Sequence, residues 1–358
     1  VRLVGSEMCI RDRNTTGNYN AAFGANALSS NTTAGSNTAL GFNTLVTNTT
    51  GSYNTATGNG ALYYNTTGGY NTGVGVSALR LNTTGGNNVA VGNNALDKNT
   101  TGSNNTGSGY RSLYSNTTAS NNTGFGYNTL RSNTTGDRNT AIGVDALAAN
   151  TTGHQNTAIG YDALTLNTTG LYNQASGVEA MRSNTTGSYN TANGYVSLGA
   201  NTTGARNTGT GYQAGYGTTT GNDNASIGYE AGNSITTGSQ NVTVGSGSQP
   251  SAVAASNQIV IGYGAAGHGD NISVIGNTDM TAWHPADDGG VDLGSSSYEF
   301  KDLYVDGVAY VDGLDLNGTT VSATAAELNI MDGVTATATE LNLIDGVTAT
   351  TAELNVVD

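Results

Sequence analysis

Cysteine is nearly absent from this sequence, charged residues make up only 10% of it, and it contains no long apolar run. The single cysteine, Cys9, and three isolated histidines form none of the clusters with which proteins bind transition metals. No apolar run reaches membrane-spanning length. No Ser/His/Asp arrangement or carboxylate pair stands out for nucleophilic or glycosidic catalysis. We therefore expect a protein that is not an enzyme, with no cofactor, no metal ion and no membrane span.

Basic residues are scarce and unevenly placed. Residues 1–266 carry 10 Lys+Arg and 9 Asp+Glu, a net charge of +1. Residues 267–358 carry 1 Lys and 16 Asp+Glu, a net charge of −15, and the two segments together give the −14 of the whole chain. Nucleic-acid binding requires clustered Lys and Arg, and the sequence shows no basic stripe. The charges therefore predict a nearly neutral main segment, an acidic tail and no nucleic-acid partner.

The abundant feature is repetition. The triplet Asn-Thr-Thr begins at every seventeenth residue from Asn14 to Asn201, twelve times, without insertion or deletion. A glycine recurs at the same spacing from Gly24 to Gly262, fifteen times. The 53 glycines are thus in register, which indicates order and not the disorder that scattered glycine would suggest. A fixed period this short is typical of a solenoid.

One repeat reads N-T-T-G-x-x-N-T-A-x-G-x-x-A-L-x-x. Asn-Thr-Thr-Gly fits a type I turn, and the fixed glycine suits a bend or a left-handed backbone conformation. The load of Gly, Asn and Thr disfavours helix. We expect two short strands and two turns per coil, and an all-β, parallel β-solenoid or β-roll of about fifteen 17-residue coils. At ~4.8 Å per coil the rod would be roughly 70 Å long.

Few side chains are available for the interior of each coil. A leucine row, one residue per coil, is predicted to point inward, and so is an apolar row directly before the fixed glycine. The leucine row comprises Leu28, Leu45, Leu62, Leu79, Leu96, Leu113, Leu130, Leu147, Leu164, Met181 and Leu198. The apolar row includes Phe23, Val74, Val91, Phe125, Ile142, Ile159, Ile227, Val244 and Ile261. About two large side chains per coil make a thin core, so we expect coils to stack and several chains to pack together.

The repeated asparagines predict amide ladders along the rod, in which each side chain bonds its copies above and below. Asn139, Asn156 and Asn190 are the predicted ladder residues, and Gly143, Gly160 and Gly194 are the predicted structural glycines. The Asn-Thr-Thr triplets are also formal glycosylation sequons. Both a structural turn and glycosylation are compatible with the sequence.

Tyrosines form two rows that are candidates for a recognition surface. The tyrosine row directly after the fixed glycine predicts possible ligand contacts at Tyr110, Tyr127, Tyr161, Tyr195, Tyr212 and Tyr229. A second row contains Tyr19, Tyr53, Tyr70, Tyr172 and Tyr189. Aromatic rings can stack on sugars and are favoured at binding surfaces. They can equally pack between coils or between chains.

Segments such as "NTAIGYDAL" (156–164), "NVTVGSGS" (241–248) and "NQIVIGYGA" (257–265) resemble the head repeats of YadA-like trimeric autotransporter adhesins. The resemblance covers roughly residues 20–276 and implies a β-roll that assembles as a homotrimer. The repeat here is longer than that of the family by the Asn-Thr-Thr-Gly turn. The step from Gly262 to Gly276 is shorter, at 14 residues.

The C-terminal part has a different character. "VDLGSSSYEFKDLYVDG" (291–307) and the "VTATxAELNxxDG" repeats resemble segments of phage tail fibres. We divide the chain into a non-native or read-through segment (1–13), a solenoid (14–276), a tail-fibre-like connector (277–320) and truncated 13-residue repeats (321–358). Capping boxes in these repeats predict short helical turns in a mixed, irregular tail. "ADDGGVD" (286–292) fits either a solvated acidic turn or a hard-cation site.

These features lead to one main functional hypothesis. We expect a non-enzymatic, homotrimeric fibre or adhesin, located outside the cell on a virion tail fibre or a cell surface, with a cell-surface glycan or protein as its receptor. An ice-binding or surface-adsorbing solenoid and a passive extracellular matrix scaffold are the alternatives. The adjacent threonines of Asn-Thr-Thr would point to opposite faces of a strand, whereas a threonine at every other residue would suit ice binding better.

Overall fold

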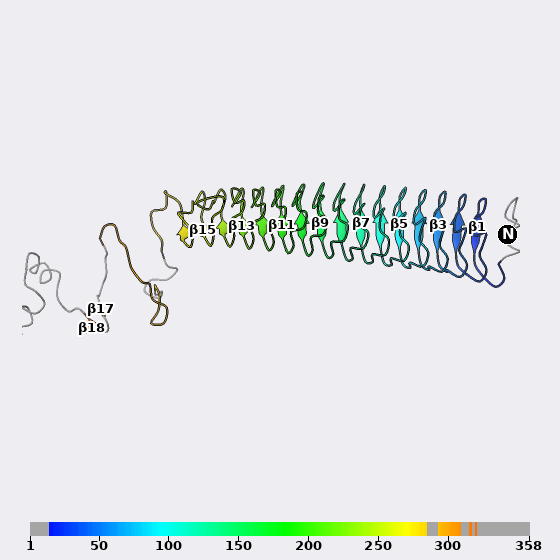
Figure 1. The fold of residues 1–358 in the computed structure, drawn as a ribbon, viewed down its shortest axis with the longest axis horizontal. Coiled ribbons are helices and arrows are strands. Elements are labelled where there is room, and N and C mark those ends of the chain that lie inside the picture. Colours follow the sequence, from blue (N-terminus) through cyan, green and yellow to red (C-terminus); the bar gives the residue numbers. More distant parts are fainter. Residues whose placement is uncertain (1–13, 285–292, 309–314, 317–318, 321–358) are drawn as a thin grey trace, which may run out of the picture. The chain divides into compact units, whose positions relative to one another are not determined.

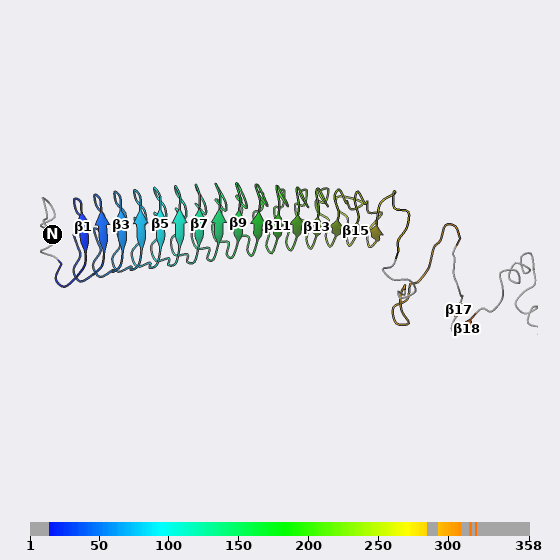
Figure 2. The same ribbon diagram turned by 180° about the vertical axis from the view of Figure 1, so that it is seen from behind.

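The computed structural model describes residues 14–284, 293–308, 315–316 and 319–320 of a chain that divides into two units, Val1–Trp283 and His284–Asp358. In the first unit every coil contributes one three-residue strand to a single sheet (Figures 1 and 2). The strands are β1 (Ala21–Phe23), β2 (Thr38–Leu40), β3 (Thr55–Thr57), β4 (Thr72–Val74), β5 (Val89–Val91), β6 (Thr106–Ser108), β7 (Thr123–Phe125), β8 (Thr140–Ile142), β9 (Thr157–Ile159), β10 (Gln174–Ser176), β11 (Thr191–Asn193), β12 (Thr208–Thr210), β13 (Ala225–Ile227), β14 (Val242–Val244), β15 (Ile259–Ile261) and β16 (Ser273–Ile275).

Each strand pairs in parallel with the strand of the next coil. Thr140 of β8, for example, lies opposite Thr157 of β9, one 17-residue repeat further along the chain. The last pair, β15 and β16, follows the 14-residue step instead, with Ile259 opposite Ser273. These registers confirm the predicted parallel β-solenoid of about fifteen 17-residue coils.

The prediction of two strands per coil was wrong, because the segment after the fixed glycine forms tight turns. In the β8 coil Asp145 and Leu147 both have positive φ, 55° and 52°. Two left-handed residues separated by one residue cannot continue an extended strand. The backbone N–H of Leu147 still bonds the next coil, donating to Ala163 O at 3.0 Å.

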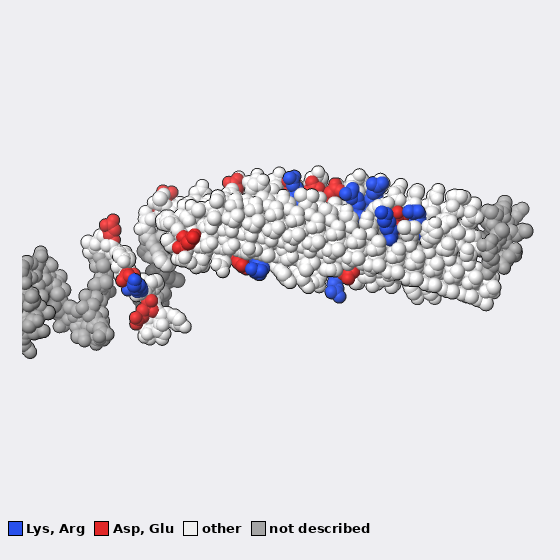
Figure 3. Space-filling model, in the orientation of Figure 1, with Lys and Arg blue, Asp and Glu red and all other residues white. Residues whose placement is uncertain are grey.

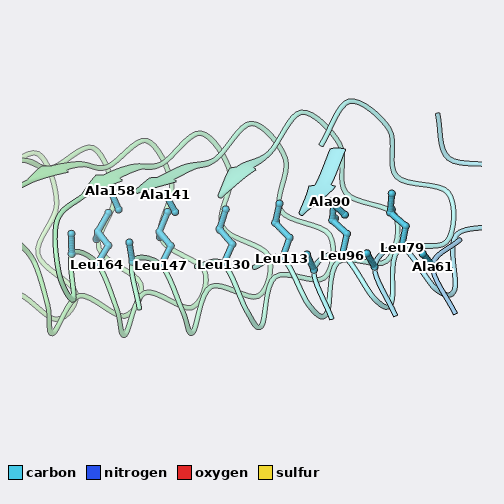
Figure 4. Close-up of a cluster of buried hydrophobic side chains, with 14 of the residues drawn as sticks. Ala61, Leu79, Ala90, Leu96, Leu113, Leu130, Ala141, Leu147, Ala158 and Leu164 are labelled. Carbon is cyan, nitrogen blue, oxygen red and sulfur yellow. The ribbon is translucent and has the colours of Figure 1, made fainter. Parts of the chain in front are cut away.

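The leucine row is buried, as predicted, and it is also backbone-strained. Leu147 and Leu164 are fully buried, and their φ values are 52° and 51°. A left-handed conformation costs roughly 1–2 kcal/mol in an L-residue, while burying a leucine side chain contributes about 1.5–3 kcal/mol. Figure 4 shows the labelled leucines lying one per coil, with the strand alanines Ala141 and Ala158 beside them. The burial of each leucine therefore offsets the strain of its own backbone.

The apolar row lies outside and not inside, so this part of the core prediction was wrong. The middle residue of each strand points inward, as Ala141 does, and its neighbours Thr140 and Ile142 must then point outward. Ile142 is 40% exposed, and Phe125 in the preceding coil is 45% exposed. From Leu28 to Leu198, each coil therefore buries one large apolar side chain, a leucine or Met181, with small residues around it. The core is thinner than the sequence suggested.

The interior changes where the leucine row ends. Gly215 and Gly232 occupy its next two positions, and their φ values of 61° and 59° keep the same turn. A side chain on Gly232 would clash with Thr243 Oγ1, at 2.6 Å from an ideal Cβ. Ile235, which stands where other coils have the first asparagine of the triplet, is fully buried. The apolar side chain has thus moved to another position of the coil.

The second unit contains two short strands among its described residues. The strands β17 (Asp315–Leu316) and β18 (Thr319–Thr320) pair in an antiparallel arrangement. The described residues include no helix. Three predictions concern segments that lie outside the described residues and remain predictions. They are the helical turns of 321–358, the non-native segment 1–13 and the acidic stretch 286–292.

Candidate recognition surface

The tyrosine row lies on the surface of the solenoid, and most of its rings stack on one another. Ring centroids are 5.3 Å apart for Tyr110 and Tyr127, 5.3 Å for Tyr195 and Tyr212, and 5.0 Å for Tyr212 and Tyr229. The interplanar angles of these pairs are 13°, 8° and 7°. In such a stack the neighbouring ring covers one or both faces. A ligand can therefore reach ring edges along the row, but ring faces only where a stack ends.

Tyr161 differs from the other residues of this row. Val144 and Val178 occupy its position in the two adjacent coils, so Tyr161 has no aromatic neighbour within the row. Its side chain is 51% exposed. The second row also stacks, with centroids 4.8 Å apart for Tyr53 and Tyr70 and 4.9 Å for Tyr172 and Tyr189.

The repeated asparagines are buried and form hydrogen-bonded ladders. Asn156 donates its backbone N–H to Asn139 Oδ1 at 2.9 Å, and its side-chain Nδ2 to Gly170 O at 2.9 Å. The side chains of Asn139 and Asn190 donate in the same way to Gly153 O and Gly204 O, each at 2.8 Å and each in the Asn-Thr-Thr-Gly turn of the next repeat. These polar side chains satisfy the backbone at the turn. Their position is inside the coil, where no ligand reaches them.

The fixed glycines end the strands. Gly143, Gly160 and Gly194 have φ values of 125°, 137° and 135°, a region that residues with a side chain rarely adopt. A Cβ at Gly143 would also meet the carbonyl oxygen of Gly160 in the next coil. The glycines therefore permit both the turn and the close stacking of coils.

The sequon asparagines form a second buried ladder. Asn65 Nδ2 donates to Asn48 Oδ1 at 2.8 Å and to Gly68 O at 2.9 Å, so both amide hydrogens are used. The asparagines from Asn31 to Asn201 in this row are at most 1% exposed. A glycan on the amide nitrogen would break both bonds and could not be accommodated inside a coil. The geometry of the folded rod favours the structural turn over glycosylation.

The outer face of the sheet carries two parallel rows. The apolar row runs beside a strand threonine row that includes Thr38, Thr55, Thr72, Thr106, Thr123, Thr140, Thr157, Thr191 and Thr208. The residue pairs Thr140/Ile142 and Thr157/Ile159 show the arrangement, in which alternate residues of each strand point outward. Each threonine of this row directly follows the second asparagine of its repeat. The row is therefore distinct from the threonines of the Asn-Thr-Thr triplet.

Charged side chains gather in two places along one edge (Figure 3). Lys98 Nζ lies 4.8 Å from the ring centroid of Tyr114, and Arg111 Cζ lies 5.5 Å from the same centroid. Further along the rod, Asp145, Asp162 and Glu179 follow one another in the row that contains Arg111. Burial and the neighbouring carboxylates raise the pKa of Asp162. We did not predict the Lys98 and Arg111 cluster, although the sequence shows that Tyr114 follows Lys98 by almost one repeat.

Within the described residues there is no group of three or more His, Cys, Asp or Glu side chains that could hold a metal ion. Over the same part of the chain, no helix has the length and apolar character needed to cross a membrane. Comparison of the chain with protein-family models, with curated proteins and with solved structures gave no match.

Proposed function

We propose that this chain is a non-enzymatic structural fibre or adhesin, in which a repetitive rod presents or forms a receptor-binding surface. We place it outside the cell, as part of a phage tail fibre or a cell-surface adhesin. The resemblance of its repeats to YadA-like heads and of its tail to tail-fibre segments supports this proposal. The solenoid fold supports it as well, because a stack of identical coils is a direct way to build a long, stiff body.

The observation that carries the proposal is the exposed apolar row on the sheet. Phe125, Ile142 and Ile159 stand in three successive coils and are 45%, 40% and 42% exposed. Aligned apolar side chains on a flat sheet form a contiguous patch, and such patches mark interaction sites. Because the core of each coil is thin, covering this row with another apolar surface would increase the stability of the folded chain.

The occupant that we propose for this row is the same row of further copies of the chain. Two parallel copies share the same coil spacing, so their apolar side chains can meet coil by coil along the rod. Closed cyclic symmetry then covers the row of every copy. We propose a homotrimer, the assembly that the YadA-like resemblance implies, with a cell-surface glycan or protein as the receptor.

Sedimentation equilibrium of the full chain tests this assembly. We expect a trimer, and we expect Ile142→Asp combined with Ile159→Asp to shift it to monomer because carboxylates would then be buried in the interface. Leu166→Asp is the matched control, since Leu166 is 48% exposed but lies away from the strands. A well-folded monomer at all concentrations would contradict the proposal.

A second candidate function is supported by the strand threonine row. Alternate threonine and apolar residues on a flat parallel sheet, repeated at ~4.8 Å, make a regular surface of the kind that an ice-binding or surface-adsorbing solenoid needs. The same face cannot be covered by other copies and also lie on ice. Thermal hysteresis above that of a control protein, together with a monomeric mass, would favour this function over the fibre.

A further inference from the structure

We propose that the cluster of Lys98, Arg111 and Arg131 around Tyr114 binds an acidic carbohydrate, a short oligosaccharide that bears sulfate or carboxylate groups. We call these four residues the basic–aromatic patch. This inference rests on the proposed receptor-binding function and names the chemical class of the receptor. Figure 3 shows the basic side chains gathered on the edge of the rod near the β5–β7 coils.

The winding of the solenoid brings the patch together. Tyr114 and Arg131 occupy the same position in successive coils, directly after the leucine row. Lys98 Nζ lies 4.8 Å from the Tyr114 ring centroid. Arg111 Cζ lies 5.5 Å from that centroid and 5.1 Å from the centroid of Tyr110. One aromatic ring therefore holds two cations close to each other.

No described carboxylate neutralises the charges of the patch. Arg80 nearby is paired with the buried Asp97, Nε to Oδ1 at 2.8 Å. Among the residues that the structure describes, Lys98, Arg111 and Arg131 form no ion pair. Arg111 Nε is moreover buried without a hydrogen-bond acceptor in that part of the chain. Adjacent cations repel one another, and an unpaired buried donor is costly, so an anionic ligand would remove two unfavourable features at once.

The surroundings favour a short acidic sugar over a long polyanion. Tyr110 stacks on Tyr127 beside the patch, and aromatic rings suit the apolar face of a sugar. Further along the same edge, Asp145, Asp162 and Glu179 would repel a polyanion that followed the rod. Nucleic acid requires a longer basic track than three cations.

Binding can be measured by isothermal titration with the full chain and three size-matched dextran oligosaccharides, one sulfated, one carboxymethylated and one uncharged. We expect the two acidic sugars to bind and the uncharged sugar not to bind. The sulfate and carboxylate arms distinguish the two sources of negative charge. A DNA duplex is the competing polyanion, and tighter binding of DNA than of either acidic sugar would overturn the proposal.

Substitutions taken from other coils should keep the fold intact. Arg111→Gln introduces the residue that another coil has at the same position, Gln213, and both positions have a positive φ. Lys98→Ser introduces the residue that the next coil has at the same position, Ser115. Since each change removes a charge-assisted hydrogen bond to an acidic group, we expect it to weaken binding about tenfold or more. Tyr114→Ala, which copies Ala148, should weaken binding without a change in charge.

The matched control removes the same charge elsewhere on the rod. Arg206→Gln copies Gln240, and Arg206 is paired with Asp223 far from the patch. We expect unchanged affinity for this variant. Equal weakening by Arg206→Gln and Arg111→Gln would show that only net charge matters and would refute the site. A trimer that fails to bind acidic sugars would refute the basic–aromatic patch but not the proposed fibre. A monomer that binds acidic sugars would refute the fibre but not the patch.

Discussion

The buried asparagine ladder can be tested by changing one amide to a carboxylate. Asn156 is fully buried and donates Nδ2 to Gly170 O at 2.9 Å and to Asn139 Oδ1 at 3.2 Å. Its Oδ1 accepts the backbone N–H of Asn173 at 3.0 Å. Asn156→Asp keeps the acceptor but removes both donated hydrogens. The new carboxylate therefore faces two oxygen atoms inside the coil.

The expected cost can be estimated from these contacts. An uncompensated buried charge costs about 3–5 kcal/mol, and each pKa unit corresponds to about 1.36 kcal/mol. The pKa of the introduced carboxyl should therefore rise by about 2–4 units from about 3.9, to roughly 6–8. A raised pKa in the folded state means that stability is full below the unfolded pKa and is lost as the pH rises through the folded pKa. We expect Asn156→Asp to be only slightly destabilised at pH ~4, with one hydrogen bond lost at about 1 kcal/mol, and strongly destabilised at pH ~8.

Urea unfolding at a fixed protein concentration and at several pH values measures this dependence. Because solenoids can unfold in parts, hydrogen exchange in the β8–β10 coils should locate the effect. Asn121→Asp is the control, since Asn121 is exposed and Asp223 occupies its position in another coil. If the two variants showed the same pH profile, the ladder would not contribute the stability that we assign to it.

Two further predictions concern the glycines and the acidic row. Gly143→Ala should destabilise the rod by about 1–3 kcal/mol or more, because φ is 125° and the new Cβ meets a carbonyl oxygen of the next coil. Gly60→Ala is the control, since the nearest atom outside its chain neighbours lies 3.9 Å from an ideal Cβ. It should cost less than Gly143→Ala in the same urea unfolding assay. The pKa of Asp162 is raised by burial and by neighbouring carboxylates, so its contribution to stability is full at low pH and is lost as the pH rises through the raised pKa. Asp162→Asn should therefore raise the urea midpoint above that of the unchanged chain at neutral pH and not at pH ~3. The same change in midpoint at both pH values would contradict this.

The period of the sequence was sufficient to predict a parallel β-solenoid of 17-residue coils, because identical residues at a fixed spacing must occupy identical environments, but it did not give the single strand of each coil. The leucine row was predictable for the same reason. The orientation of the apolar row was not. Ile142 is more apolar than Ala141, and the hydrophobic pattern alone would place it inside. The left-handed turn at Leu147 fills the interior, however, and leaves room opposite it only for a small side chain.

The surface was predictable in part. Tyrosines that share a position, such as Tyr195 and Tyr212, can be seen as a row in the sequence, and the structure shows that they stack. Lys98, Arg111 and Tyr114 occupy three different positions of the repeat, so no single column reveals them. Only the winding of the chain shows that they meet. Residues that break the repeat are therefore harder to place from the sequence than residues that follow it.

Irregular residues also have a structural role in the assembly that we propose. A uniform apolar row would let parallel copies slip along one another by whole coils, because each coil offers the same contact to its neighbours. The row is interrupted by Ser176, Asn193 and Thr210 in three successive coils, with Ile159 before them and Ile227 after them. A slip of one coil would place a polar side chain of one copy against an isoleucine of another, and a buried polar group without a partner is costly. In the proposed trimer the polar interruption therefore favours a single register between copies, just as the pairing of buried faces with buried faces fixes the register between strands.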